Sequence, residues 1–81
     1  MKKHTYCVSY ITKRNRRQNE HGLYIDADNA KEARACFDKF YETVFKGERN
    51  VPHPFHIVVF RMKEDDILDI DYMHISAEWV L

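Results

Sequence analysis

The sequence predicts an α+β fold of the order ββαββ, in which one helix packs on one face of a four-stranded antiparallel sheet. Three observations predict this fold. Side chains alternate with a period of two near the N-terminus, apolar residues recur every three or four positions in the middle of the chain, and extended segments follow two prolines. At 81 residues, the chain is expected to form one small domain, residues 1–81, with a single core.

The first two strands are predicted to form a hairpin. Residues 4–12 alternate with a period of two, which is typical of a strand. The two faces of this strand are Tyr6, Val8 and Tyr10 on one side and Cys7, Ser9 and Ile11 on the other. Residues 13–19 are polar and strongly basic, and the alternation resumes at residues 23–25. We therefore expect a hairpin with a long cationic tip, in which Gly22 marks a bulge or the entry to the second strand.

A helix is predicted from about residue 29 to residue 46. Asn29 and Glu32, three residues later, fit a capping box at its start. Lys46 in the last turn and Gly47 just after it are the expected stop signals. The apolar stripe of this helix consists of Ala30, Ala33, Phe37, Phe40, Tyr41 and Val44.

The last two strands are predicted to form a second hairpin. Residues 48–54 contain two prolines and are expected to be a loop. Residues 55–63 and 68–80 are the expected strands, joined by a turn at residues 65–67. With Glu64 opposite Leu68, this register gives chemically matched pairs: Lys63 with Asp69, Arg61 with Asp71, Val59 with Met73, Ile57 with Ile75 and Phe55 with Ala77.

This second hairpin is apolar on both faces, and a single helix covers only one of them. We expect the larger face to take the core: Phe55, Ile57, Val59, Met73, Ile75, Ala77 and Trp79. The other face then stays exposed, unless sheet twist and the loop around Pro52 shield it. An exposed apolar patch marks an interface. The expected contact residues with a protein partner, or with a second copy in a homodimer, are Val58, Phe60, Met62, Ile70 and Tyr72.

The charges are segregated along the chain, although the formal net charge is zero. Residues 1–20 hold six basic residues and one acidic residue, which gives +5. Residues 64–81 hold six acidic residues and no Lys or Arg, which gives −6. The expected partner-binding cations of the hairpin tip are Lys13, Arg14, Arg16 and Arg17. Four such cations can contact successive phosphates, and the alternative is a solvated turn.

The sequence contains no catalytic signature, so we expect neither enzyme activity nor a cofactor. His53 and His56 have the spacing H-x-x-H, but Pro54 lies between them and no CxxC motif is present. The acidic residues of segment 64–71 lack the glycine and the terminal glutamate of an EF-hand loop. We therefore expect a solvated or salt-bridged surface at these positions rather than a metal site.

The cysteine count and the first residues predict a cytoplasmic location. Cys7 and Cys36 fall far short of a disulfide framework, which is the usual support of a small secreted domain. Polar residues interrupt the apolar run that a signal peptide needs. The longest uninterrupted apolar stretch, residues 57–60, is too short to cross a bilayer.

One local pattern resembles a known family. A strand hairpin with a basic tip, followed by a helix that opens Asp28-Asn29-Ala30-Lys31-Glu32-Ala33, is similar to the sheet-and-helix arm domains of tyrosine recombinases. The resemblance covers residues 5–45 and lacks a third strand before the helix, so it assigns no family.

Taken together, these features predict a small non-catalytic binding module. It would hold a macromolecular partner through the basic hairpin, residues 13–17, and through the apolar sheet face, with a homodimer as one form of that contact. Two alternatives use the same features. One is a nucleic-acid-binding accessory protein, and the other is a phage or mobile-element inhibitor whose acidic hairpin at residues 64–71 mimics nucleic acid.

Overall fold

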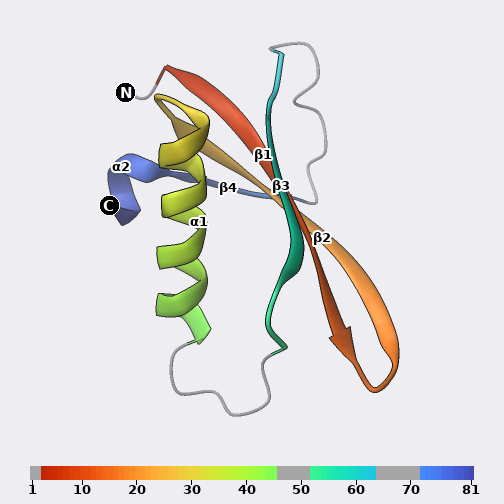
Figure 1. Ribbon diagram of the computed structural model, residues 1–81. Helices are drawn as coiled ribbons and strands as arrows, with labels where there is room; N and C mark the ends of the chain where they lie inside the picture. The colour runs from red at the N-terminus through yellow and green to blue at the C-terminus, as the bar shows by residue number, and fades with distance from the viewer. Residues whose placement is uncertain (1–2, 46–51, 64–71) are drawn as a thin grey trace.

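The computed structural model describes residues 3–45, 52–63 and 72–81. The helices and strands in the described residues are β1 (His4–Arg14), β2 (Arg17–Ala27), α1 (Ala30–Phe45), β3 (Phe55–Arg61), β4 (Met73–Ser76) and α2 (Ala77–Val80). The main helix, α1, packs on one side of a four-stranded sheet (Figure 1), which confirms the predicted α+β fold.

The sheet is mixed, and the predicted all-antiparallel arrangement is wrong. Its strand order is β3-β1-β2-β4. β1 is antiparallel to both β2 and β3, whereas β4 is parallel to β2. β3 and β4 therefore lie at opposite edges of the sheet and do not form a hairpin with each other.

The predicted register of the closing hairpin is wrong for the same reason. Val59 pairs with Val8 of β1, and Ile75 pairs with Ile25 of β2. Apolar alternation determines which face of a strand is buried, but it does not determine which neighbour the strand pairs with. The predicted pairs that involve Asp69 and Asp71 lie outside the described residues.

The central hairpin is longer than predicted. β1 and β2 each have 11 residues, and their register runs without a break from His4↔Ala27 to Arg14↔Arg17. Asn15 and Arg16 form the two-residue turn with φ angles of 51° and 68°, the positive values of a type I′ turn. Gly22 lies within β2 rather than at its entry, because the polar residues 17–22 also pair with β1.

β3 and β4 cover only part of this hairpin. β3 pairs with residues 6–11 of β1, and β4 pairs with residues 23–26 of β2. A bulge in β3 places His56, at a φ of 49°, where the register shifts between Ser9 and Ile11. The closed end of the hairpin therefore extends beyond its neighbours as a two-stranded ribbon (Figure 1).

The predicted capping interaction is present at the start of α1. The Glu32 N–H donates to Asn29 Oδ1 at 2.8 Å, and the Asp28 N–H donates to Glu32 Oε1 at 3.3 Å. α1 ends at Phe45, and the predicted stop signals Lys46 and Gly47 lie outside the described residues.

The core lies between α1 and the sheet. Its buried members are Tyr6, Val8, Leu23, Ile25, Ala27, Ala33, Cys36, Phe37, Ile75 and Ala77. Of the predicted helix stripe, Ala30 and Val44 are exposed because they lie near the two ends of α1. Ile57 and Val59 pack against the core as predicted.

Trp79 is not in the core, which corrects the prediction. Its side chain is 74% exposed, because the chain stops being a strand at Ser76 and forms the short helix α2. The Ser76 hydroxyl accepts from the Glu78 N–H at 3.3 Å and caps this helix. Met73, also predicted for the core, is 57% exposed at the start of β4.

The sheet face opposite α1 has its own packing. Tyr24 is buried there, with its ring centroid 5.5 Å from that of Tyr72 and 6.0 Å from that of His74. Asp26 accepts from the Thr5 hydroxyl at 2.6 Å and lies 2.8 Å from His74 Nε2. Tyr72 rests on the bare backbone of Gly22, where a Cβ atom would lie 2.7 Å from Cζ of the ring.

We expect Gly22→Ala to lower the free energy of unfolding by about 1–3 kcal/mol, because the added methyl group overlaps the Tyr72 ring. Chemical denaturation of four chains measures this effect: wild type, Gly22→Ala, Tyr72→Ala and the double variant. In the Tyr72→Ala background the alanine at position 22 meets no ring, so its cost should largely disappear. Equal costs in both backgrounds would contradict the close contact.

Candidate functional site

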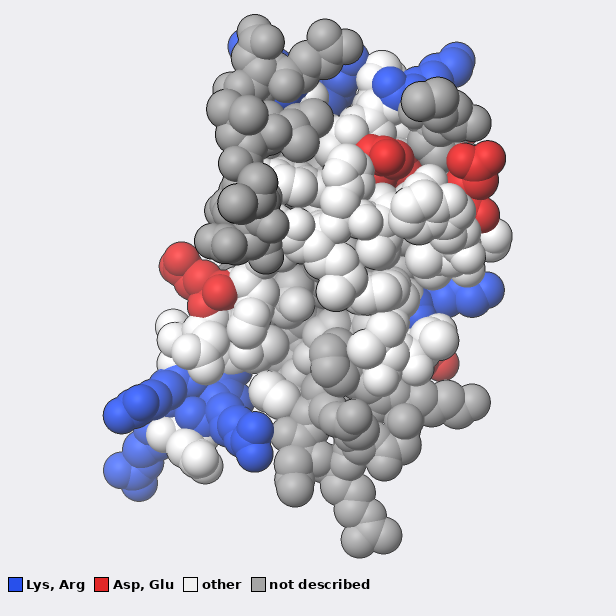
Figure 2. Space-filling model, turned by 180° about the vertical axis from the view of Figure 1, so that it is seen from behind, with Lys and Arg blue, Asp and Glu red and all other residues white. Residues whose placement is uncertain are grey.

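The four predicted cations lie together at the tip of the central hairpin. Lys13 and Arg14 end β1, Arg16 is in the turn and Arg17 begins β2. All four side chains are exposed, and Figure 2 shows a cluster of basic groups at the lower left of the molecule. None of them makes a side-chain hydrogen bond or an ion pair with a described residue. We call these four residues the basic tip.

The backbone at the basic tip is unfavourable for one of these cations. The second position of a type I′ turn favours glycine, because both central residues need a positive φ. Asn15 suits the first position, since asparagine tolerates the left-handed region, but Arg16 has a φ of 68° at the second. Backbone preference therefore does not explain an arginine at this position.

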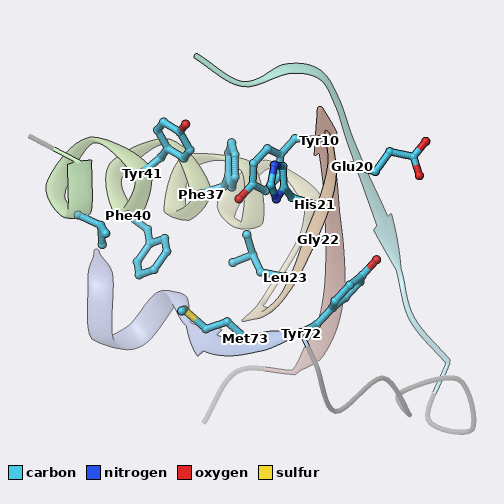
Figure 3. Close-up of a pocket in the computed structure, with 11 residues that line it drawn as sticks. Tyr10, Glu20, His21, Gly22, Leu23, Phe37, Phe40, Tyr41, Tyr72 and Met73 are labelled. Atoms are coloured by element: carbon cyan, nitrogen blue, oxygen red, sulfur yellow. The ribbon is translucent and has the colours of Figure 1, made fainter. Parts of the chain in front are cut away.

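A cavity of about 360 Å³ opens between α1 and β2, at the level where β4 begins. Its walls are mostly aromatic and aliphatic: Tyr10, Leu23, Phe37, Phe40, Tyr41, Val44, Tyr72 and Met73, with Glu20, His21 and Gly22 along the strand. Figure 3 shows Leu23, Phe40 and Met73 directed toward the space between the helix and the sheet. Its size and apolar walls suit a single bulky apolar group.

Two interactions hold His21 in the wall of this cavity. Its ring stacks on that of Tyr10 at a centroid distance of 5.0 Å and an interplanar angle of 22°. Its Nε2 lies 2.8 Å from the Thr12 hydroxyl. Tyr10 in turn contacts Phe37 at a centroid distance of 5.0 Å, so the aromatic wall is continuous from the sheet to the helix.

The outer edge of β2 beside this cavity has no partner strand among the described residues. β4 pairs with residues 23–26 and leaves residues 17–21 uncovered on that side. In an antiparallel ladder closed by a two-residue turn, alternate residues direct their backbone groups away from the partner strand. For β2 these residues are Gln18, Glu20 and Gly22. The backbone N–H and C=O groups of these residues therefore point outward along the rim of the cavity.

The predicted apolar contact residues do not form one patch. Val58 and Phe60 are 53% and 45% exposed on β3, on the face opposite α1. Tyr72 precedes β4, at the other edge of the sheet, and packs on Tyr24. Met62 is half-buried just after β3, where its N–H donates to the Thr5 carbonyl at 2.8 Å. Ile70 lies outside the described residues, as does the acidic segment 64–71.

The cysteines and histidines form no metal cluster in the described part of the chain. No group of three or more His, Cys, Asp and Glu residues lies close enough there to hold a metal ion. Cys7 and Cys36 are both buried and are not joined in a disulfide. Burial, with a smaller contribution from the Glu32 carboxylate, raises the pKa of the Cys36 thiol to about 11. Cys36 is therefore protonated at neutral pH and is a poor nucleophile.

Sequence patterns identified the basic tip but missed the cavity and the open edge of β2. Both depend on where β4 begins relative to β2, and no local pattern carries that information. Across residues 3–45, 52–63 and 72–81, no helix combines the length and apolar character needed to cross a membrane.

Comparisons of the chain with protein-family models, with curated proteins and with solved structures found no match. The geometry and charge of the site are therefore the only indications of function.

The raised pKa values predict a loss of stability at high pH. A thiol or phenol that stays neutral in the folded state stabilises it fully below the ordinary pKa, and this stabilisation is lost as pH rises toward the folded pKa. For Cys36 that window runs from about pH 9 to about pH 11. The pKa values of Tyr10 and Tyr41 are also raised by burial and act in the same direction above pH 10.

Urea denaturation between pH 7 and pH 11 should show a free energy of unfolding that falls above about pH 9. Cys36→Ala, which removes the thiol, should be less stable at pH 7 but should decline less steeply. A wild-type stability that is flat or rising up to pH 11 would contradict this assignment.

Proposed function

We propose that this chain is a non-catalytic binding module that holds a protein partner, with the basic tip as its electrostatic contact. The observation that carries this proposal is the set of four exposed cations at the end of a projecting ribbon, none of which forms an ion pair with a described residue. The positive φ of Arg16 adds to it, because a residue kept against its backbone preference is expected where its side chain has a function.

A concentrated positive charge favours an acidic partner surface. Like charges held within a few ångströms raise the local potential, which steers an anionic partner and weakens with salt. Arg14 and Arg17 are directly opposite each other in the ladder, a placement that is unfavourable in the free protein. A carboxylate from the partner would relieve this repulsion and form charge-assisted hydrogen bonds with both guanidinium groups.

Exposed apolar side chains favour a protein as the partner class. Val58 and Phe60 on β3, and Trp79 on α2, are large apolar groups in contact with solvent. Two copies that pair through Val58 and Phe60 would form a homodimer with a self-complementary interface. A cytoplasmic location is part of the proposal, since Cys7 and Cys36 are not joined in a disulfide.

Nucleic acid is the second candidate partner, and the shape of the hairpin favours it. A two-stranded ribbon fits the major groove of B-DNA, and four cations can each neutralise a phosphate. Binding of this kind would depend steeply on salt, with a log–log slope of about −3 to −4 for four phosphate contacts.

The variant Arg16→Gly distinguishes between a basic tip that binds a partner and a turn that is only solvated. Glycine suits the positive φ, so the variant should gain about 1 kcal/mol in free energy of unfolding. If the tip binds the partner, the same variant should capture less of it, and Arg14→Ala with Arg17→Ala should capture less still. The measurement is quantitative capture from nuclease-treated lysate, followed by mass spectrometry.

The matched control is Lys31→Ala with Lys39→Ala, which removes two exposed cations from α1 instead of two from the tip. Capture that falls equally in both double variants reflects overall charge. A stabilised Arg16→Gly chain with unchanged capture shows a solvated turn and overturns the proposal. Anisotropy with labelled duplex DNA and single-stranded RNA at low salt tests the second candidate, and no binding there excludes it.

Self-association through β3 is tested by Phe60→Asp. Phe60 is 45% exposed, so the variant should fold, as judged by circular dichroism, and should be monomeric by sedimentation. Thr43→Asp, on the exposed surface of α1, is the control and should sediment like the wild type. A wild type that is monomeric at high concentration removes the homodimer from the proposal.

A further inference from the structure

The open edge of β2 offers backbone hydrogen bonds that the described residues leave unused. Gln18 and Glu20 direct their N–H and C=O groups outward, and Gly22 directs its N–H outward, over a stretch of about 13 Å. An exposed strand edge of this kind accepts an extended chain as a further strand, and the main-chain bonds supply affinity without regard to side chains.

Leu23, Phe37 and Phe40 line the cavity on the α1 side of this edge. Leu23 belongs to the core under α1, so by strand alternation His21 and Arg17 also have their side chains on the face that carries α1. A strand added beside β2 alternates in the same way. One of its side chains would enter the cavity beside His21, where Phe40, Leu23 and Met73 make an apolar surround.

The other end of this groove is positively charged. Arg17 lies four residues before His21 along β2, which corresponds to about 13 Å, and Arg14 is its cross-strand neighbour. A residue of the added strand about four positions from the cavity would therefore lie beside two guanidinium groups. An acidic side chain is the complementary residue at that position.

From this arrangement we infer that residues 17–22 and the cavity form a groove for an extended acidic peptide, which joins the sheet beside β2. The peptide carries a bulky apolar residue in the cavity and an aspartate or glutamate about four residues away, on the same face. This inference rests on the proposed function, because the peptide is the segment of the protein partner that the module holds.

Selection from a displayed library of random peptides about ten residues long tests the groove without knowledge of the natural partner. The wild-type chain is the target, and Glu20→Pro is the counter-target. Proline removes the outward N–H of Glu20 but leaves the bonds to β1, because the N–H of this residue does not point toward β1. The expected result is enrichment, on the wild type, of peptides with an apolar residue and an acidic residue about four positions apart.

Synthetic copies of the enriched peptides, labelled with a fluorophore, then measure affinity by anisotropy. Glu20→Pro should bind about tenfold more weakly or worse than Glu20→Ala, a reference that loses the same carboxylate but keeps the N–H. Val44→Trp, which fills the cavity from the exposed end of α1, should also weaken binding. Its control, Thr43→Trp, adds the same group outside the cavity and should bind like the wild type.

Hydrogen exchange gives an independent readout. In the free chain the amides of Gln18 and Glu20 should exchange faster than those of Asn19 and His21, which face β1. Bound peptide should slow the first pair. The inferred groove is contradicted if no peptides are enriched. It is also contradicted if neither Glu20→Pro nor Val44→Trp changes the affinity of the enriched peptides. Capture of a partner that depends on the tip would then still support the proposed function, whereas binding of nucleic acid alone would overturn both.

Discussion

The ladder between β1 and β2 is the constraint on which the rest of the structure depends. The two-residue turn at Asn15 and Arg16 sets its register, and a slip of one residue would turn every buried side chain of one strand to the opposite face. In the observed register, Val8 and Ile25 both face α1 and are completely buried. The same ladder offers two edges, and β3 and β4 each take one of them.

The unequal lengths of the strands create the candidate functional surface. Both central strands have 11 residues, whereas β3 has 7 and β4 has 4, so the end of the hairpin extends past its neighbours. The basic tip is exposed for this reason. Among the described residues the edge of β2 is open, and the cavity reaches it, because β4 begins only at Met73, opposite Leu23. Charge, open edge and apolar cavity thus have one structural origin.

Gly22 in β2 and Arg16 in the turn both run against local backbone preference, and described packing compensates only at Gly22. Glycine weakens a strand interior, but at Gly22 the missing side chain makes room for the Tyr72 ring. The packing of this ring offsets the lower stability of glycine in a strand. At Arg16 a positive φ is forced on a residue that does not favour it, and no described contact of its side chain compensates. In proteins, such a disagreement is expected at a site of function rather than in the scaffold.

The sequence by itself determined the features that depend on neighbours in the chain. The capping box of Asn29 and Glu32, the start of α1 and the basic hairpin tip all rest on residues within a few positions of one another. Only the tertiary structure decided the partners of β3 and β4, the exposed position of Trp79 and the open groove beside β2. The physical reason is that the alternation of side chains specifies which face of a strand is buried. It does not specify the partner strand, because the backbone edges of different strands offer the same hydrogen-bonding groups.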